Sequence, residues 1–311
     1  MRIREVDASI APDEELLAIH AIERACLLEL IPGEPSRSAE EAVAFYRHPP
    51  SNVTRHVWVW DDEGVANLVL HGPAAVFGEV LVTPSARRRG IGAALLEALL
   101  ARARELDLKQ VHGHHATPTG AAFCARAGAV DGQRDVRSLL RLADAVLPQP
   151  ELPAGWSLVS WTRRAPDELV ASYARARSAL DDAPTPDGME FPVETTESLR
   201  DVEDALERRG REGRVTVAVD PDGEVGSFTE VRLTPGSALA FTEDTATVAA
   251  QRGQGLATAV KLESLRRLRA ERPEVEVLTT MNAEDNRVMR RLNERIGFSV
   301  AATLTTATIT L

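Results

Sequence analysis

The chain contains Arg87-Arg88-Arg89-Gly90-Ile91-Gly92 and, 165 positions further on, Arg252-Gly253-Gln254-Gly255-Leu256-Ala257. Both stretches read R-x-x-G-x-G/A, and both stand between an apolar, strand-like run and a helix-like run. In such a turn the backbone N–H groups converge on one point, and the following helix adds the positive end of its dipole. Glycine lets the backbone come close to a ligand because it has no Cβ. The repeat therefore predicts two related phosphate-binding domains.

The composition is typical of a globular protein of about two domains. The 311 residues include 44% hydrophobic and 27% charged residues, which are ordinary shares. No apolar run has the length of a membrane span, and the N-terminus lacks the apolar core of a secretory signal. Two cysteines are too few for a disulfide framework, so we expect a cytoplasmic protein. The net charge of −11 argues against nucleic-acid binding.

The two halves of the chain have the same order of predicted elements. A proline-rich stretch separates them, so we predict a linker at 148–155 between domains at 1–147 and 156–311. Each half starts with a strand and two helices, continues with a hairpin and the strand before the glycine turn, and ends helix–strand–helix–strand. This order predicts an α+β fold in which helices flank mixed, largely antiparallel sheets.

Two other phosphate-binding motifs do not fit these turns. A P-loop is absent because no G-K-[ST] follows either pair of glycines. A dinucleotide-binding Rossmann fold places its glycines in a repeated βαβ unit, whereas these glycines follow a predicted hairpin.

The element order around the repeated turn resembles that of the GNAT acyl-CoA N-acyltransferases, and two such halves resemble two-domain GNAT proteins of the mycothiol-synthase type. The first half is similar to the family's core motif over 82–92, and the second half over 247–257 and again at 282–286. The resemblance implies an acetyl-CoA-dependent N-acetyltransferase that moves an acyl group from coenzyme A to the amine of a small molecule by direct attack.

The resemblance also implies where coenzyme A binds. Each turn would hold its pyrophosphate, and the edge of the preceding strand would pair with its pantetheine arm. The implied residues are Val80, Leu81, Val82, Arg87, Arg88, Arg89, Gly90, Ile91 and Gly92 in the first half, and Thr245, Ala246, Thr247, Arg252, Gly253, Gln254, Gly255, Leu256, Ala257 and Asn286 in the second.

Acetyl transfer needs a base, because most amines are protonated near neutral pH, and an acid for the departing thiolate. The candidate bases are Glu79 and Asp244, which also lie 165 positions apart, with Glu243 and Glu230 as further candidates. A solvated strand face or a salt bridge explains each of these carboxylates equally well.

The family's usual acid is a Tyr, and the resemblance places that position at Cys124 in the first half and Asn293 in the second. The thiol of Cys124 can donate a proton. The alternative interpretation is that Cys124 is a small buried residue that only packs a helix. An amide cannot give up a proton, so the acid of the second half stays unassigned.

Three histidines, His112, His114 and His115, share one predicted strand, but no further ligand completes a metal site, and none is predicted.

The polar residues kept by the second half favour it for the chemistry, while both halves are expected to bind coenzyme A. Because the Tyr is missing from both halves, a catalytically silent acyl-CoA sensor is the main alternative; a protein or peptide amine as acceptor is another. Acidic pairs, Asp181-Asp182 and Glu284-Asp285, would suit a cationic amine. We expect no nucleic-acid or membrane partner, and either a monomer with its halves as a pseudo-dimer or a homodimer.

Overall fold

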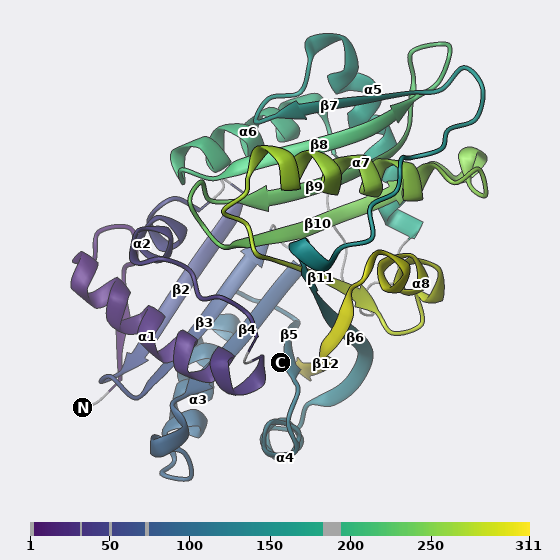
Figure 1. Ribbon diagram of the computed structural model, residues 1–311. Coiled ribbons are helices and arrows are strands. Elements are labelled where there is room, and N and C mark those ends of the chain that lie inside the picture. The colour runs from purple at the N-terminus through teal and green to yellow at the C-terminus, as the bar shows by residue number, and fades with distance from the viewer. Residues whose placement is uncertain (1–2, 32, 50–51, 72–74, 183–193) are drawn as a thin grey trace. The chain divides into compact units, whose positions relative to one another are not determined.

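The computed structural model describes residues 3–31, 33–49, 52–71, 75–182 and 194–311, and both halves have the predicted order of elements (Figure 1). The helices and strands of the first half are β1 (Ile3–Val6), α1 (Asp13–Leu30), α2 (Ala39–Arg47), β2 (Val53–Trp60), β3 (Gly64–His71), β4 (Ala75–Val82), α3 (Ile91–Glu105), β5 (Gln110–His115), α4 (Pro118–Arg126) and β6 (Val130–Arg141). Those of the second half are β7 (Ser157–Thr162), α5 (Asp167–Arg177), α6 (Thr196–Arg208), β8 (Glu212–Val219), β9 (Val225–Leu233), β10 (Leu239–Thr247), α7 (Leu256–Glu271), β11 (Val277–Ala283), α8 (Arg287–Ile296) and β12 (Ser299–Thr310). The predicted α+β fold is confirmed.

The chain forms two compact units that are not continuous in sequence. Among the described residues, the first unit holds 3–136 and 301–311, and the second holds 137–182 and 194–300. The chain therefore leaves the first unit within β6, before the predicted linker at 148–155. The linker itself stays a prediction.

Each half gives its last strand to the sheet of the other unit. In the first unit β12 pairs antiparallel with β5, from Thr305 opposite His115 to Thr310 opposite Gln110. In the second unit β6 is the neighbour of β11. The strand next to β5 or β11 is thus supplied by a part of the sequence that is far away.

Strand alternation in the first unit separates two layers of core. Val57, Val59 and Val65 pack with buried residues of α1 on one face of the sheet. Trp58 and Leu68, which point the other way, pack against α3. Even- and odd-numbered residues of β2–β4 therefore face different helices, and Asn67 and Glu79 lie on the face covered by α1.

The second unit follows the same rule. Val217 and Phe228 pack with α5 on one face, and Ala218 packs with residues of α7 on the other. Phe228 on β9 and Ala246 on β10 both belong to the core under α5. Glu230 lies two residues from Phe228, and Asp244 lies two residues from Ala246, so both carboxylates are on this face of the sheet.

Candidate active site

Both glycine turns have the backbone that a phosphate cradle needs. Gly90 precedes α3 with φ 85°, and Gly255 precedes α7 with φ 81°. Two residues earlier, Arg88 (φ 66°) and Gly253 (φ 80°) are also left-handed. A Cβ at Gly90, Gly253 or Gly255 would meet no atom within 4 Å, so the concave side of each turn is open to a ligand. The turns therefore fit an anionic group held by backbone N–H donors.

The first arginine of each motif braces the turn from behind. Arg87 Nε donates to the carbonyl of Val82 at 3.1 Å, and Arg252 Nε donates to the carbonyl of Thr247 at 3.2 Å. In the first unit the Arg87 guanidinium also donates to both carboxylate oxygens of Glu29, at 3.0 and 2.5 Å. These contacts tie the turn to the end of the preceding strand and give the repeated arginine a structural role.

A splay between β4 and β5 opens one edge of β4. Of the described residues of β4, Phe77 alone pairs with β5, opposite His112, whereas pairing with β3 continues to Val82. At the start of the splay a Cβ on Gly113 would lie 2.8 Å from the carbonyl oxygen of Gly78, so the strands approach there as only glycine allows. The backbone of Val80, Leu81 and Val82 is left with a free edge, which suits an extended arm that adds as a strand.

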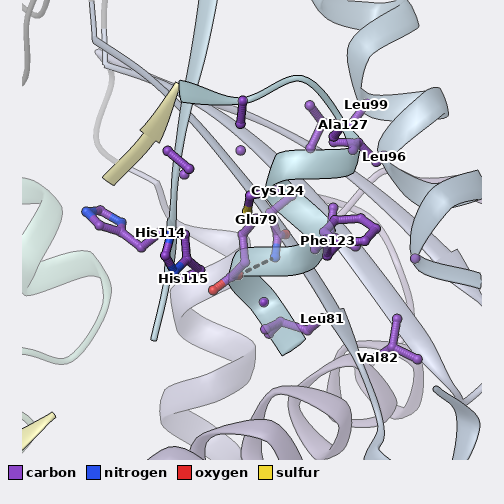
Figure 2. Close-up of a pocket in the computed structure, with 18 of the residues that line it drawn as sticks. Glu79, Leu81, Val82, Leu96, Leu99, His114, His115, Phe123, Cys124 and Ala127 are labelled. Atoms are coloured by element: carbon purple, nitrogen blue, oxygen red, sulfur yellow. Dashed lines mark hydrogen bonds between the residues drawn. The ribbon is translucent and has the colours of Figure 1, made fainter. Parts of the chain in front are cut away.

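A cavity of 1310 Å³ in the first unit joins the open edge to the glycine turn. Figure 2 shows its wall, with Leu81 and Val82 from β4, Leu96 and Leu99 from α3, and Phe123 and Cys124 from α4. The predicted residues that line it are Glu79, Val80, Leu81, Val82, Arg87, Arg88, Gly90, Ile91, Gly92 and Cys124. Arg89 is not among the lining residues and pairs with Glu63 instead, at 2.5 Å.

Glu79 opens onto this cavity from β4 (Figure 2). Asn67 on β3 pairs with it across the strands, and Asn67 Nδ2 donates to Glu79 Oε2 at 3.0 Å. The protein around the cavity raises the pKa of Glu79 by burial, and the charge of Glu23 adds to the effect. A carboxylate with a raised pKa accepts a proton from an ammonium group more readily, so Glu79 has the properties of a general base.

Both cysteines of the chain line the same cavity. Cys124 lies on α4, at the position that the family gives to its acid, and burial raises the pKa of its thiol. Cys26 on α1 donates to the carbonyl of Val82 at 3.4 Å, and burial raises its pKa too. A thiol that stays protonated is suited to proton donation, and Cys124 keeps that role as a candidate.

The equivalent place in the second unit holds two carboxylates and a cation. Arg177 from α5 donates to Glu230 Oε2 at 3.2 Å and to Asp244 Oδ2 at 2.9 Å. Arg232 holds the other oxygen of Glu230 at 2.6 Å. Burial opposes ionisation of Glu230, but Arg232 and Arg177 outweigh it and lower the pKa of this carboxyl. Glu230 is therefore a weaker base than Glu79, and Asp244 is engaged by the same guanidinium.

A β-bulge distinguishes β10 from β4. The register of β10 against β9 shifts between Thr242 and Thr245, whereas β4 pairs with β3 without a shift. Glu243 lies in this bulge and forms no ion pair with the described residues. The residue is exposed, but the surrounding protein still raises the pKa of its carboxyl by burial. The charges of Arg232 and Arg211 reach Glu243 without forming an ion pair with it, so Glu243 is the less constrained candidate base of the second unit.

The other predicted residues of the second unit have structural partners. Asn286 caps α8 through its side chain, which accepts from the N–H of Met289 at 3.1 Å. Asn293 is buried and donates to Asn282 at 2.8 Å. Thr245 and Thr247 hydrogen-bond to hydroxyl groups on β9, at 2.7 and 2.9 Å.

The histidines of β5 are separated by their partners. His112 is buried and bonds to Thr308 at 2.9 Å, and His115 bonds to Asp131 at 2.9 Å. His114 lines the cavity and stacks on the ring of Phe77. In the part of the chain that the structure describes, no three His, Cys, Asp or Glu side chains are grouped so that they could hold a metal.

Sequence reasoning missed Asn67 and Arg177, the residues that decide how Glu79 and Asp244 differ. Neither belongs to a motif, and each meets its carboxylate only through the fold. The available signal was that Glu79 and Asp244 differ by the same 165 positions as the two glycine turns. Equivalent carboxylates invite a comparison of the residues that contact them.

A phosphate turn, a splayed strand edge and a carboxylate in one cavity define an acyl-CoA-dependent transferase. The family profile of the acetyltransferase (GNAT) domain matches residues 54–128. The mycothiol acetyltransferase of Clavibacter sepedonicus is 31% identical over 248 residues, which cover 78% of this chain and 75% of that protein. That of Salinispora arenicola is 33% identical over 245 residues, covering 76% and 74%.

Solved structures have the same two-unit fold. A tandem GNAT protein from the clavulanic acid biosynthesis pathway, solved without AcCoA, superimposes with a TM-score of 0.84 at 26% identity, covering 99% of this chain and 98% of that one. A GCN5-related N-acetyltransferase from Sphaerobacter thermophilus has the same fold, with a TM-score of 0.74 at 17% identity over 99% of this chain and 96% of that one.

The chain belongs to the GNAT acetyltransferase family, to which it is linked by its mycothiol acetyltransferase relatives, and it has the architecture of the solved tandem GNAT protein. It is an acetyl-CoA-dependent N-acetyltransferase whose acceptor is the amine of a small molecule. None of the helices within the described ranges is long and apolar enough to cross a membrane.

Proposed function

We propose that acetyl transfer takes place in the cavity of the first unit, with Glu79 as the general base. The observation that carries this proposal is that Glu79 opens onto the cavity between the glycine turn and the free edge of β4. The retained polar residues favour the second half in the sequence, but Arg177 engages two of them, Glu230 and Asp244.

Bound acetyl-CoA supplies the activated acetyl group. The turn at Gly90 orients it through backbone N–H groups, and the backbone groups that β4 presents at its open edge between Val80 and Val82 fix the arm beside the splay. Glu79 takes the proton of the incoming ammonium group, and Asn67 holds the Glu79 carboxylate in place. The Cys124 thiol supplies a proton to the leaving sulfur. Water is displaced from the cavity when both substrates fill it, which strengthens each of these contacts.

The acceptor is a small primary amine, which reaches Glu79 as an ammonium ion attracted by the carboxylate. The names of the relatives support a mycothiol precursor as one amine to test. Asp181 and Asp182 favour a cationic acceptor in the sequence, but the structure does not describe their side chains. The two free thiols support a reducing, cytoplasmic setting, and the exchange of β6 and β12 within one chain supports a monomer.

Release of free thiol from acetyl-CoA with a panel of amines, the mycothiol precursor included, tests the proposal. Glu79→Gln is expected to lower kcat/KM by about 10²- to 10³-fold, because removal of a positioned base has that effect. The matched control is Glu243→Gln, which removes the candidate base of the second unit.

The pH dependence adds a second readout. The wild-type rate should fall with acid through the raised pKa of Glu79, above the ordinary glutamate value of 4.5, and the Glu79→Gln variant should lack this limb. Loss of activity in Glu243→Gln alone would assign the reaction to the second unit. Absence of thiol release with every amine of the panel, alongside tight coenzyme A binding, would favour the sensor.

A further inference from the structure

A second charged group, the guanidinium of Arg55, faces the cavity of the first unit. Arg55 on β2 lines the cavity, and its Nε is buried with no hydrogen-bond partner. Nowhere in the described ranges does a carboxylate form an ion pair with this guanidinium. A charge removed from bulk water in this way is costly unless something pairs with it. The charges of Glu23 and Glu79 act on this guanidinium from beyond ion-pair distance, so it can still take a direct anionic partner from a ligand in the cavity.

Two aromatic rings of α2 hold the guanidinium in place. Arg55 Cζ lies 4.3 Å from the ring centroid of Phe45 and 5.1 Å from that of Tyr46. Stacking uses the flat face of a guanidinium and leaves its N–H groups at the edge free for a ligand. Arg37 also lies over the Phe45 ring, at 4.5 Å, but is not one of the residues that line the cavity.

Arg55 and Glu79 point to the same side of the sheet. Arg55 pairs with Val69 on β3, and Val69 pairs with Phe77, two residues before Glu79 on β4. Residues two apart on a strand share a face. Strands about 4.8 Å apart and a rise of about 3.4 Å per residue place the two Cα atoms roughly 12 Å from each other. The two long side chains shorten this gap to the length of a small molecule.

We propose that Arg55 binds a carboxylate of the acceptor, so that the substrate is a zwitterion with its amine at Glu79 and its carboxylate at Arg55. A guanidinium and a carboxylate match in shape and form two parallel charge-assisted hydrogen bonds. The contact fixes the acceptor at the end away from the reaction and turns its amine toward the base. Arg55 is then a specificity residue of the cavity, and this role rests on the proposed function.

Pairs of amines that differ only in this group test the inference. The probes are β-alanine and γ-aminobutyrate, each compared with its carboxamide, in the thiol-release assay. In the wild type we expect the amino acids to be the better acceptors by about 100-fold in kcat/KM, since loss of one partner of a buried charge pair costs on this scale. In Arg55→Met this preference should vanish through a higher KM for the amino acids, while the carboxamides change by less than about threefold.

The controls separate recognition from folding. Arg37→Met removes a neighbouring cation over the same ring and should keep the preference for the carboxylate. If Arg55→Met does not fold, Arg55→Lys keeps the charge without the paired donors and should lower the preference about tenfold.

Equal loss for amino acids and carboxamides would show that Arg55 only supports α2 and would overturn the inference. A wild type that prefers the carboxamides or the mycothiol precursor would overturn it too. Failure of the proposed function gives another result: no amine of any kind releases thiol, or Glu79→Gln stays fully active.

Discussion

Glu79 and Asp244 occupy equivalent strand positions, yet their partners give them different chemistry. An amide hydrogen-bonds to Glu79, and no arginine forms an ion pair with it among the described residues, whereas Arg177 bridges Asp244 and Glu230. Two neighbouring carboxylates repel each other unless a cation lies between them, so the presence of Glu230 on β9 makes Arg177 necessary. The identity of one cross-strand neighbour, Asn67 or Glu230, thus separates a candidate base from a structural ion pair.

Lys261 shows a different effect of burial at the residue scale. It is 2% exposed on α7, close to the ring of Phe298, and burial lowers its pKa to about 8 from 10.5. Between these pH values the unfolded chain binds more protons than the folded chain, so the free energy of unfolding should rise with pH across this window. Below about pH 8 the cost of the buried charge is constant.

Lys261→Met should therefore raise the free energy of unfolding at pH 7 by roughly 1 to 3 kcal/mol and remove the rise with pH. Urea unfolding from pH 7 to 10.5 measures both effects. Lys109→Met, at an exposed position, is the control and should leave the pH profile unchanged. A less stable Lys261→Met protein would mean that the ammonium makes a favourable contact.

At the scale of elements, the glycine turn and the strand before it were predictable because their signal is local. Glycine spacing, a preceding apolar run and a following helix pattern lie within about twenty neighbouring residues. The ends of elements were less accurate: β6 starts at Val130, whereas the pattern indicates a strand only from Arg137. Its first residues, from Val130 to Gly132, are exposed, and partners in the sheet rather than periodicity hold them.

The two turns differ at one backbone position, and this predicts a stability change. Arg88 has φ 66°, where Gly253 stands in the other turn with φ 80°. A side chain in this conformation costs about 1–2 kcal/mol. Arg88→Gly should therefore raise the free energy of unfolding by about 1 kcal/mol in denaturant titration, and Gly253→Arg should lower it by a similar amount. Destabilisation by Arg88→Gly would show that the Arg88 side chain contributes more than the backbone strain costs.

At the scale of the whole molecule, the exchange of last strands could not be predicted. Both halves are complete in their order of elements, and the pattern of β12 does not reveal that its partner is β5. A sheet position can be filled by any strand of suitable pattern, so pairing between distant segments is a property of the fold. Arg55 and Arg177 could not be found from sequence motifs for the same reason. Arg55 reaches the cavity, and Arg177 reaches Glu230 and Asp244, only in the folded chain.

The central claim, that the first unit performs the reaction, is tested most directly by comparing kcat/KM of Gly90→Val and Gly255→Val in the thiol-release assay. Each change fills one turn at a residue with positive φ, where a Cβ meets no protein atom. The backbone strain of the two variants is alike, so the difference between them reports on the ligand. We predict that Gly90→Val loses at least about 100-fold, as mispositioning of a substrate can do, and that Gly255→Val keeps most of the wild-type activity. Loss of activity in Gly255→Val with an active Gly90→Val protein would contradict the account.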